Sequence, residues 1–283
     1  MKPAEFAYVR PGSVHEALRL LADNAGRGRL LAGGQSLGPM LNLRLATPEL
    51  VIDIGRLHEL QRVETIASGL VIGSGVCHAD FEDGRVPDVA GGLLRRAAAG
   101  IAYRAVRNRG TIGGSLAHAD PAADWPPVMI ALGAHLDIAS ARSRRRIAAA
   151  DFAPGVLATV LEPDEMIEAI QIPKAASELR WGHYKIAAQP GDFAESLAVA
   201  AIQKNGTDAR IVLAGRSRTP ILLLETARAM AGIRKWSSDQ HAIIANALDS
   251  DRARLGLGSG LSPGDRAIHL ASVSRAAREA IAS

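Results

Sequence analysis

Two short segments combine paired glycines with hydroxyl-bearing residues, and they limit the folds open to this chain. The first is Ala32-Gly33-Gly34-Gln35-Ser36 and the second is Thr111-Ile112-Gly113-Gly114-Ser115. Backbone amides beside glycine converge easily on an anion, and the hydroxyl groups add further donors. Either segment alone is more often an ordinary turn. A fold that brings both together would hold a diphosphate between them.

Other nucleotide-binding motifs are missing from the sequence. No Gly-Lys dipeptide occurs, so the chain has no P-loop. The run Gly256-Leu257-Gly258-Ser259-Gly260 starts like a dinucleotide fingerprint, but Leu261 stands where the last glycine is needed and no predicted strand precedes it. We interpret this run as a loop before the last helix.

The pattern of apolar and turn residues predicts an α+β fold in three parts. Residues 1–55 read as a small α/β unit, in which Ser13 opens a helix and Glu16 completes a capping box. Residues 56–173 read as a larger mixed unit. Its predicted elements are a hairpin over 61–76, a helix over 88–99, a helix that begins after Asp124, and strands at 135–139, 146–149 and 166–172.

A linker at 173–178 leads into the third part, residues 174–283. A small antiparallel sheet with helices follows. Its strands are predicted at 181–186, 196–203 and 208–214, and its helices at 222–231, 239–248 and 264–282. The Asn205-Gly206 pair between the second and third of these strands is typical of a hairpin turn.

Composition excludes several classes of protein. Cys77 is the only cysteine, so the chain has no internal disulfide and cannot ligate an iron–sulfur cluster through its own thiolates. The net charge is +4, but aromatic residues make up only 4%, which argues against nucleic-acid binding. No apolar run is long enough to cross a bilayer and the first residues lack a signal-peptide pattern. We therefore expect a cytoplasmic protein.

Residues 32–46 and 105–134, together with 163–173 and 183–194, resemble the FAD-binding medium subunits of the xanthine dehydrogenase group of molybdenum hydroxylases. Within this group, the motifs are similar to those of carbon monoxide dehydrogenase and the quinoline oxidoreductases. The resemblance covers nearly the whole chain. It implies a two-part FAD-binding region of the PCMH type, followed by a domain that covers the flavin.

The resemblance also implies a role and a set of FAD contacts. FAD would pass electrons from the 2Fe–2S clusters of a small subunit to an external acceptor, while a large molybdopterin subunit hydroxylates a small substrate. The resemblance favours an N-heteroaromatic compound as this substrate. A dimer of such heterotrimers is expected, and this chain would have no catalytic or metal-binding residues of its own. The implied FAD contacts are Leu31, Ala32, Gly33, Gly34, Gln35, Ser36, Leu37, Ile101, Thr111, Gly113, Gly114, Ser115, His118, Asp124, Ile167 and Lys185.

The sequence departs from the family at one place beside the expected flavin. Relatives often carry two cationic residues before the Gly-Asp-Phe-Ala segment, whereas Gln189 and Pro190 stand there in this chain. This puts NAD as the electron acceptor in doubt. The role of His118 also stays open between a cofactor contact and a structural histidine.

Two rival functions are open, and so are the roles of two groups of arginines. The chain is alternatively an autonomous FAD-dependent oxidoreductase of the vanillyl-alcohol-oxidase type, or an assembly module that binds no FAD. The basic run at Arg142, Arg144, Arg145 and Arg146 fits a solvated hairpin tip, or a docking patch for a partner subunit. Three alternatives are likewise open for Arg104, Arg107 and Arg109. They contact the cofactor phosphates, they contact a partner subunit, or they are only solvated.

Overall fold

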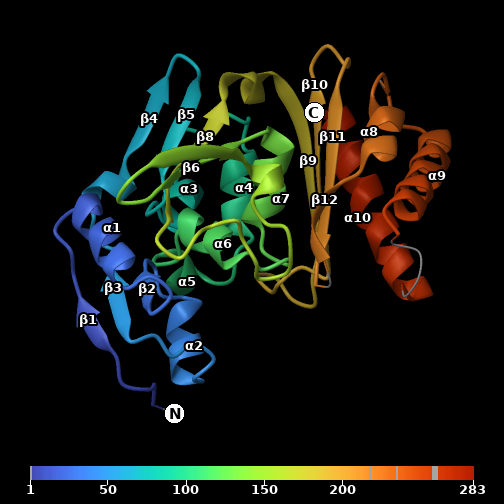
Figure 1. Cartoon of the computed structure of the whole chain (residues 1–283). Helices are drawn as coiled ribbons and strands as arrows, with labels where there is room; N and C mark the ends of the chain where they lie inside the picture. The colour runs from blue at the N-terminus through green and yellow to red at the C-terminus, as the bar shows by residue number, and fades with distance from the viewer. Residues whose placement is uncertain (1, 217, 234, 257–260) are drawn as a thin grey trace.

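The computed structural model describes residues 2–216, 218–233, 235–256 and 261–283. Three β-sheets follow one another along the chain, and helices lie around and between them (Figure 1). Within the described ranges, none of the helices has the length and apolarity needed to cross a membrane. The α+β fold class is confirmed.

The first sheet is parallel and carries the first glycine-rich segment. Its order is β1 (Ala7–Val9), β3 (Leu50–Asp53) and β2 (Gly28–Leu31). Helix α1 (Val14–Asp23) begins at the predicted cap, where the Ser13 hydroxyl accepts a bond from the Glu16 amide at 3.1 Å. The glycine-rich segment then connects β2 to α2 (Leu37–Asn42).

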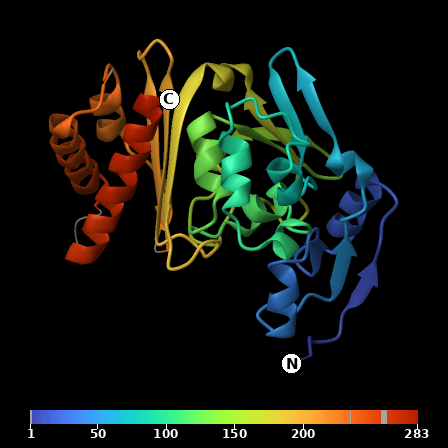
Figure 2. The same ribbon diagram turned by 180° about the vertical axis from the view of Figure 1, so that it is seen from behind.

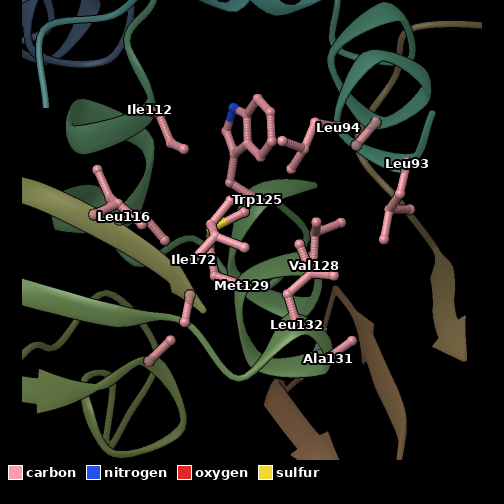
Figure 3. Packing of buried hydrophobic residues seen from close by; sticks show 14 of the residues in the cluster. Leu93, Leu94, Ile112, Leu116, Trp125, Val128, Met129, Ala131, Leu132 and Ile172 are labelled. Atoms are coloured by element: carbon pink, nitrogen blue, oxygen red, sulfur yellow. The ribbon is translucent and has the colours of Figure 1, made fainter. Parts of the chain in front are cut away.

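The second sheet has five antiparallel strands in the order β4 (Val63–Ile66), β5 (Gly69–Gly73), β8 (Met166–Pro173), β6 (His135–Ala139) and β7 (Arg144–Ala148). Its helices are α3 (His78–Glu82), α4 (Leu93–Ala99), α5 (Arg104–Arg107), α6 (Ile112–His118) and α7 (Trp125–Leu132). Short 3-10 turns lie at His58–Gln61 and Ala149–Asp151. Helix α7 is apolar on all sides and fills the core, where Trp125, Val128 and Met129 are buried (Figure 3).

The third sheet is antiparallel, in the order β12 (Arg218–Leu222), β11 (Ala209–Gly215), β10 (Ser196–Gln203) and β9 (Leu179–Ile186). Its helices are α8 (Leu224–Met230), α9 (Ser238–Arg254) and α10 (Pro263–Ala282). Strand β10 alternates between two cores. Leu197 and Val199 pack on the α7 side, and Ala198 and Ala200 pack on the α10 side. The sheet therefore joins the middle of the molecule to its C-terminal helices.

The structure corrects several predicted boundaries. The predicted helix over 88–99 begins only at Leu93. The helix predicted over 222–231 begins at Leu224, after strand β12 has ended at Leu222, and the predicted linker is a 3-10 turn at Lys174–Glu178. The helices α3, α5 and α6 were missed because each has seven residues or fewer, which is too short for a periodic pattern. Most of the predicted loop at 256–260 lies outside the described residues.

The basic run at the β6–β7 hairpin is neutralised within the chain. Each of its arginines forms an ion pair with a carboxylate of a neighbouring segment. The pairs are Arg142–Asp164, Arg144–Glu168, Arg145–Glu165 and Arg146–Asp137, at 2.7 to 3.2 Å. Since the arginines are largely exposed, the solvated hairpin is the better interpretation, and the run is not a free positive patch.

Candidate functional site

The two glycine-rich segments meet at Gly33. A Cβ atom on Gly33 would lie 2.0 Å from the carbonyl oxygen of Arg109 and 2.8 Å from the Cα atom of Gly110. The Arg109 side chain also reaches back, and its Nε donates to the Gly33 oxygen at 3.4 Å. Only glycine fits such a close approach of two backbones. The fold thus joins the segments, as the sequence predicted.

The first segment offers its amides to a ligand. Among the described residues, the backbone N–H groups of residues 33–37 donate to no protein acceptor, although Gly38 donates to the Gly34 oxygen at 3.0 Å. Gly34 has a φ of +75°, which turns the backbone sharply between β2 and α2. Unpaired amides in a tight bend before a helix form an anion-binding geometry.

The glycine amides of the second segment are not free to bind a ligand. It forms the first turn of α6, where Gly113 donates to the Ser74 oxygen at 2.9 Å and Gly114 donates to the Thr111 hydroxyl at 3.0 Å. Ser115 donates to the Thr111 oxygen at 3.0 Å. The prediction that this segment also supplies free amides is therefore wrong. Its available donors are the hydroxyl groups of Thr111 and Ser115, since an oxygen that accepts one bond still carries its own proton.

A cavity of about 260 Å³ opens where the segments meet. Ala32 and Gly33 line it from one side and Thr111 from the other, and Arg10, Arg56 and Arg109 contribute positive charge. Arg10 is paired with Asp53 at 3.1 Å, whereas Arg56 and Arg109 have no carboxylate partner among the described residues. Two unpaired guanidinium groups beside free amides suit a diphosphate.

The other two arginines before the second segment have different partners. Arg104 binds Asp83 through two bonds of 2.6 Å, and Arg107 binds Glu82. Arg107 also donates to the carbonyl oxygens of Ile101 and Ala102 at 2.8 Å. Arg104 thus pairs with carboxylates and Arg107 also fixes the backbone, and of the three arginines Arg109 is the one that lines the cavity.

Asp124 and Lys185 form a buried ion pair between the second and third sheets. The Lys185 Nζ atom lies 3.0 Å from the Asp124 carboxylate and donates to the Gly100 oxygen at 3.1 Å. Burial raises the pKa of Asp124 to about 6, although the Lys185 ammonium opposes this. Its Oδ1 atom is within ion-pair distance of Lys185 but makes no aligned hydrogen bond among the described residues. The pair therefore has a free acceptor inside the protein.

The remaining predicted contacts occupy different places. Ile101 follows Gly100 and packs against the core beside the buried pair, while His118 ends α6. Ile167 lies on β8 with only 4% of its surface exposed, so its side chain belongs to the core and only its backbone could face a ligand. Helix α6, which contains most of the second segment, packs against β8, and the side chains of Ile112 and Ile167 belong to the same hydrophobic core. In the first segment, Gln35 bonds to Gly33.

His78 was not predicted, yet it lies directly beneath the second segment. Its amide donates to the Gly110 oxygen at 2.9 Å, and its Nδ1 accepts from the Trp125 indole at 3.0 Å. Burial lowers the pKa of His78 to about 4, and Arg107 lowers it further. Nearby, Cys77 lines the cavity, and burial raises the pKa of its thiol, as expected for an unreactive cysteine. Only the fold reveals these roles, because no sequence motif marks them.

Acid should destabilise the protein through two buried histidines. Burial also lowers the pKa of His183 to about 4, so both histidines stay neutral when folded and take up protons on unfolding below pH 6.5. Their stabilisation is present above pH 6.5 and is lost as the pH falls toward 4. From pH 7 to pH 5 we expect a loss of about 2 kcal/mol per histidine in the free energy of unfolding, measured with urea.

Asp124 acts in the opposite direction. Because its pKa is raised in the folded protein, a fall from pH 7 to pH 5 protonates the folded state more than the unfolded state and raises the free energy of unfolding by about 1 kcal/mol. The variant His183→Leu provides the control. The Nε2 atom of His183 has no hydrogen-bond partner among the described residues, so leucine removes the titration without leaving a former partner of Nε2 unsatisfied. An unchanged loss of stability in this variant would contradict the assignment.

Comparisons with known proteins agree with this geometry. Residues 4–175 match the family model described as the FAD binding domain in molybdopterin dehydrogenase. The chain is 37% identical over 225 residues to caffeine dehydrogenase subunit beta of Pseudomonas sp. strain CBB1, covering 78% of this chain and 76% of that one. It also superimposes on a structure of carbon monoxide dehydrogenase from Hydrogenophaga pseudoflava with a TM-score of 0.89 and 32% identity, over 100% of this chain and 99% of that chain.

A third similarity is to the crystal structure of quinoline 2-oxidoreductase from Pseudomonas putida 86. The TM-score is 0.85 and the identity 32%, over 99% of this chain and 100% of that chain. The similarity thus extends through all three sheets.

Proposed function

Because the chain belongs to the FAD-binding medium subunits of the molybdenum hydroxylase family, an oxidoreductase family, we propose that it carries electrons from the iron–sulfur clusters of a partner subunit to an external acceptor. Its partners in this proposal are a small iron–sulfur subunit and a large molybdopterin subunit, assembled as a dimer of heterotrimers. The large subunit oxidises the substrate. This chain performs no substrate chemistry itself.

The residues present fit FAD. The free amides of residues 33–37 and the cavity beside them suit the diphosphate, with charge from Arg56 and Arg109 and hydroxyl groups from Thr111 and Ser115. This combination of free amides, unpaired cations and a cavity is the observation that carries the proposal. Gly113 contributes to the site through packing. It lets α6 lie close to Ser74, which follows β5, since a Cβ on Gly113 would lie 2.3 Å from the Cβ of Ser74.

The flavin end of FAD is assigned to the buried pair. Asp124 and Lys185 lie beside Ile101 at the junction with the third sheet, and the free Oδ1 of Asp124 is an acceptor for a ribityl or ring-proximal donor. Bound FAD supplies electron transfer in steps of one or two. The chain positions it, excludes water through the third sheet, and holds Asp124 charged by the neighbouring ammonium. The backbone of Ile167 and the side chain of His118 stay proposed contacts.

We propose the same three domains as the sequence predicted, namely residues 1–55, 56–173 and 174–283. The three sheets fall one in each range, which supports the division. The proposed substrate class is N-heteroaromatic, supported by relatives named caffeine dehydrogenase subunit beta and nicotine 6-hydroxylase medium subunit, the latter 39% identical over 213 residues.

Purification of the chain tests the proposal against both rivals. We expect a yellow protein that releases FAD on heating, with one FAD per chain by absorbance and mass spectrometry, and no turnover of candidate substrates without partners. Turnover by the isolated chain would favour an autonomous oxidase, and a colourless protein that takes up no FAD would favour an assembly module. Arg109→Gln should weaken FAD binding about tenfold, as expected for loss of a charge-assisted contact.

A further inference from the structure

The side chain of His78 contacts the backbone at the point where the two glycine-rich segments touch. A Cβ atom on Gly110 would lie 2.8 Å from the His78 Nε2 atom and 2.9 Å from its Cδ2 atom, so this edge of the imidazole faces Gly110. The Cα atom of Gly110 also approaches Gly33, on which a Cβ atom would lie 2.8 Å from it. The Gly110 backbone is therefore in close contact with both the first segment and the imidazole.

A buried hydrogen bond connects this imidazole to Trp125. The indole Nε1 donates to the His78 Nδ1 atom at 3.0 Å, and both side chains are buried. Since an indole N–H is a donor only, Nδ1 carries no proton and the neutral ring has its proton on Nε2. Burial favours this state, because it lowers the pKa of His78 to about 4 and keeps the ring neutral at pH 7.

Trp125 lies at the other end of the proposed FAD site. It directly follows Asp124, the N-cap of α7, whose carboxylate pairs with Lys185 at 3.0 Å. The ring of Phe81 packs against the indole, with 4.6 Å between the centroids. Figures 1 and 2 both show the second sheet and its helices between the first sheet and the third. The His78–Trp125 bond thus connects the backbone beside the diphosphate cavity to the residue assigned to the flavin end.

The chain between these two ends does not fix their separation by itself. It runs from Gly110 through α6 and then through a turn at residues 119–124, where Ala119 has a φ of +51°. Apolar packing holds α6 and α7 in one core, but apolar contacts have no direction. A hydrogen bond requires its donor and acceptor to be aligned, so it restricts the relative position of the two ends more closely.

We propose that His78 is a positioning residue for FAD, and that its bond to Trp125 sets the separation between the diphosphate segment and Asp124. The inference rests on the proposed function, because this separation matters only to a ligand that spans both ends. FAD has a diphosphate and a flavin, whereas ADP has the diphosphate alone. The bond should therefore contribute to the affinity for FAD and not to the affinity for ADP.

The test measures FAD and ADP binding to the full-length chain after its flavin has been removed with potassium bromide. His78→Phe keeps a ring beside Gly110 but removes the acceptor. FAD should bind about tenfold more weakly, since the ligand must restore the arrangement when it binds. The bond from the His78 amide to the Gly110 oxygen stays in this variant, so ADP should bind as tightly as before. Flavin fluorescence gives the FAD affinity, and calorimetry gives the ADP affinity.

Trp125→Phe removes the donor and completes a double-mutant cycle. Each single variant breaks the same bond, so His78→Phe/Trp125→Phe should bind FAD no more weakly than either single variant. If the two losses multiply, the side chains act independently through packing, and the inference is overturned. If Trp125→Phe does not fold, the comparison of FAD with ADP in His78→Phe still decides the question.

Trp181→Phe is the matched control. Trp181 donates a similar indole bond to the Gly91 oxygen at 3.1 Å, and neither residue lines the cavity, so this variant should bind FAD normally. The visible circular dichroism of bound flavin should change in His78→Phe and not in Trp181→Phe, because the flavin meets Asp124 differently. Unchanged FAD affinity in His78→Phe, or an equal loss for FAD and ADP, would overturn the inference. If the unsubstituted chain takes up no FAD, the proposed function fails instead.

Discussion

Replacing Gly33 with alanine should abolish flavin retention and strongly destabilise the protein. The new Cβ would lie 2.0 Å from the Arg109 carbonyl oxygen, and this neighbour is backbone that cannot rotate away. The two glycine-rich segments would have to separate, which removes one wall of the cavity. We expect a loss of about 3 kcal/mol or more, the upper end of the cost of overpacking. Thermal unfolding and the flavin absorbance after gel filtration measure both effects.

A matched control for this substitution lies five residues along the chain. Gly38 is in α2, has no positive φ, and would place a Cβ with no other atom within 4 Å. Gly38→Ala should therefore retain flavin and keep or slightly raise the stability, since alanine favours a helix. If Gly33→Ala retains a full complement of flavin at normal stability, the contact between the segments does not build the site.

Most of the fold was predictable because its longer elements carry local signals. Ser13 and Glu16 set the start of α1, and Asn205-Gly206 set the β10–β11 turn. Strand β12 was not predictable from its own residues. It contains Pro220, which argues against a strand, but β12 is an edge strand paired only with β11, where a missing amide is tolerated. Its place depends on tertiary pairing rather than on local sequence.

The sequence predicted where the site lies better than it predicted which of its groups are free to bind a ligand. The glycines marked where two segments meet, but sequence alone does not tell an amide that is free from one already bonded. In the first segment the glycines leave amides open, whereas Gly113 serves close packing on Ser74. Arg10 and Arg56 come from distant parts of the chain and follow no motif, so only the folded structure brings them to the cavity.

Replacing Lys185 with methionine should reveal how much the buried ion pair contributes. Methionine fills similar volume but leaves Asp124 buried without its cation, which costs about 3 to 5 kcal/mol when a buried charge loses its partner. Asp124 limits this cost by binding a proton, and its pKa should rise well above 6. Stability should therefore fall most above this raised pKa and recover as the pH falls from it toward 6, as measured by urea unfolding across this range.

The double variant Lys185→Met/Asp124→Leu separates folding from function. It removes both charges, so most of the stability lost in Lys185→Met should return. Flavin affinity should stay low, because the free carboxylate oxygen and the ammonium have both been removed from the proposed site. If the double variant regained both stability and flavin, the pair would serve packing alone, and the flavin end would have to lie elsewhere. If it stayed as unstable as the single variant, the loss in Lys185→Met would not arise from an uncompensated charge.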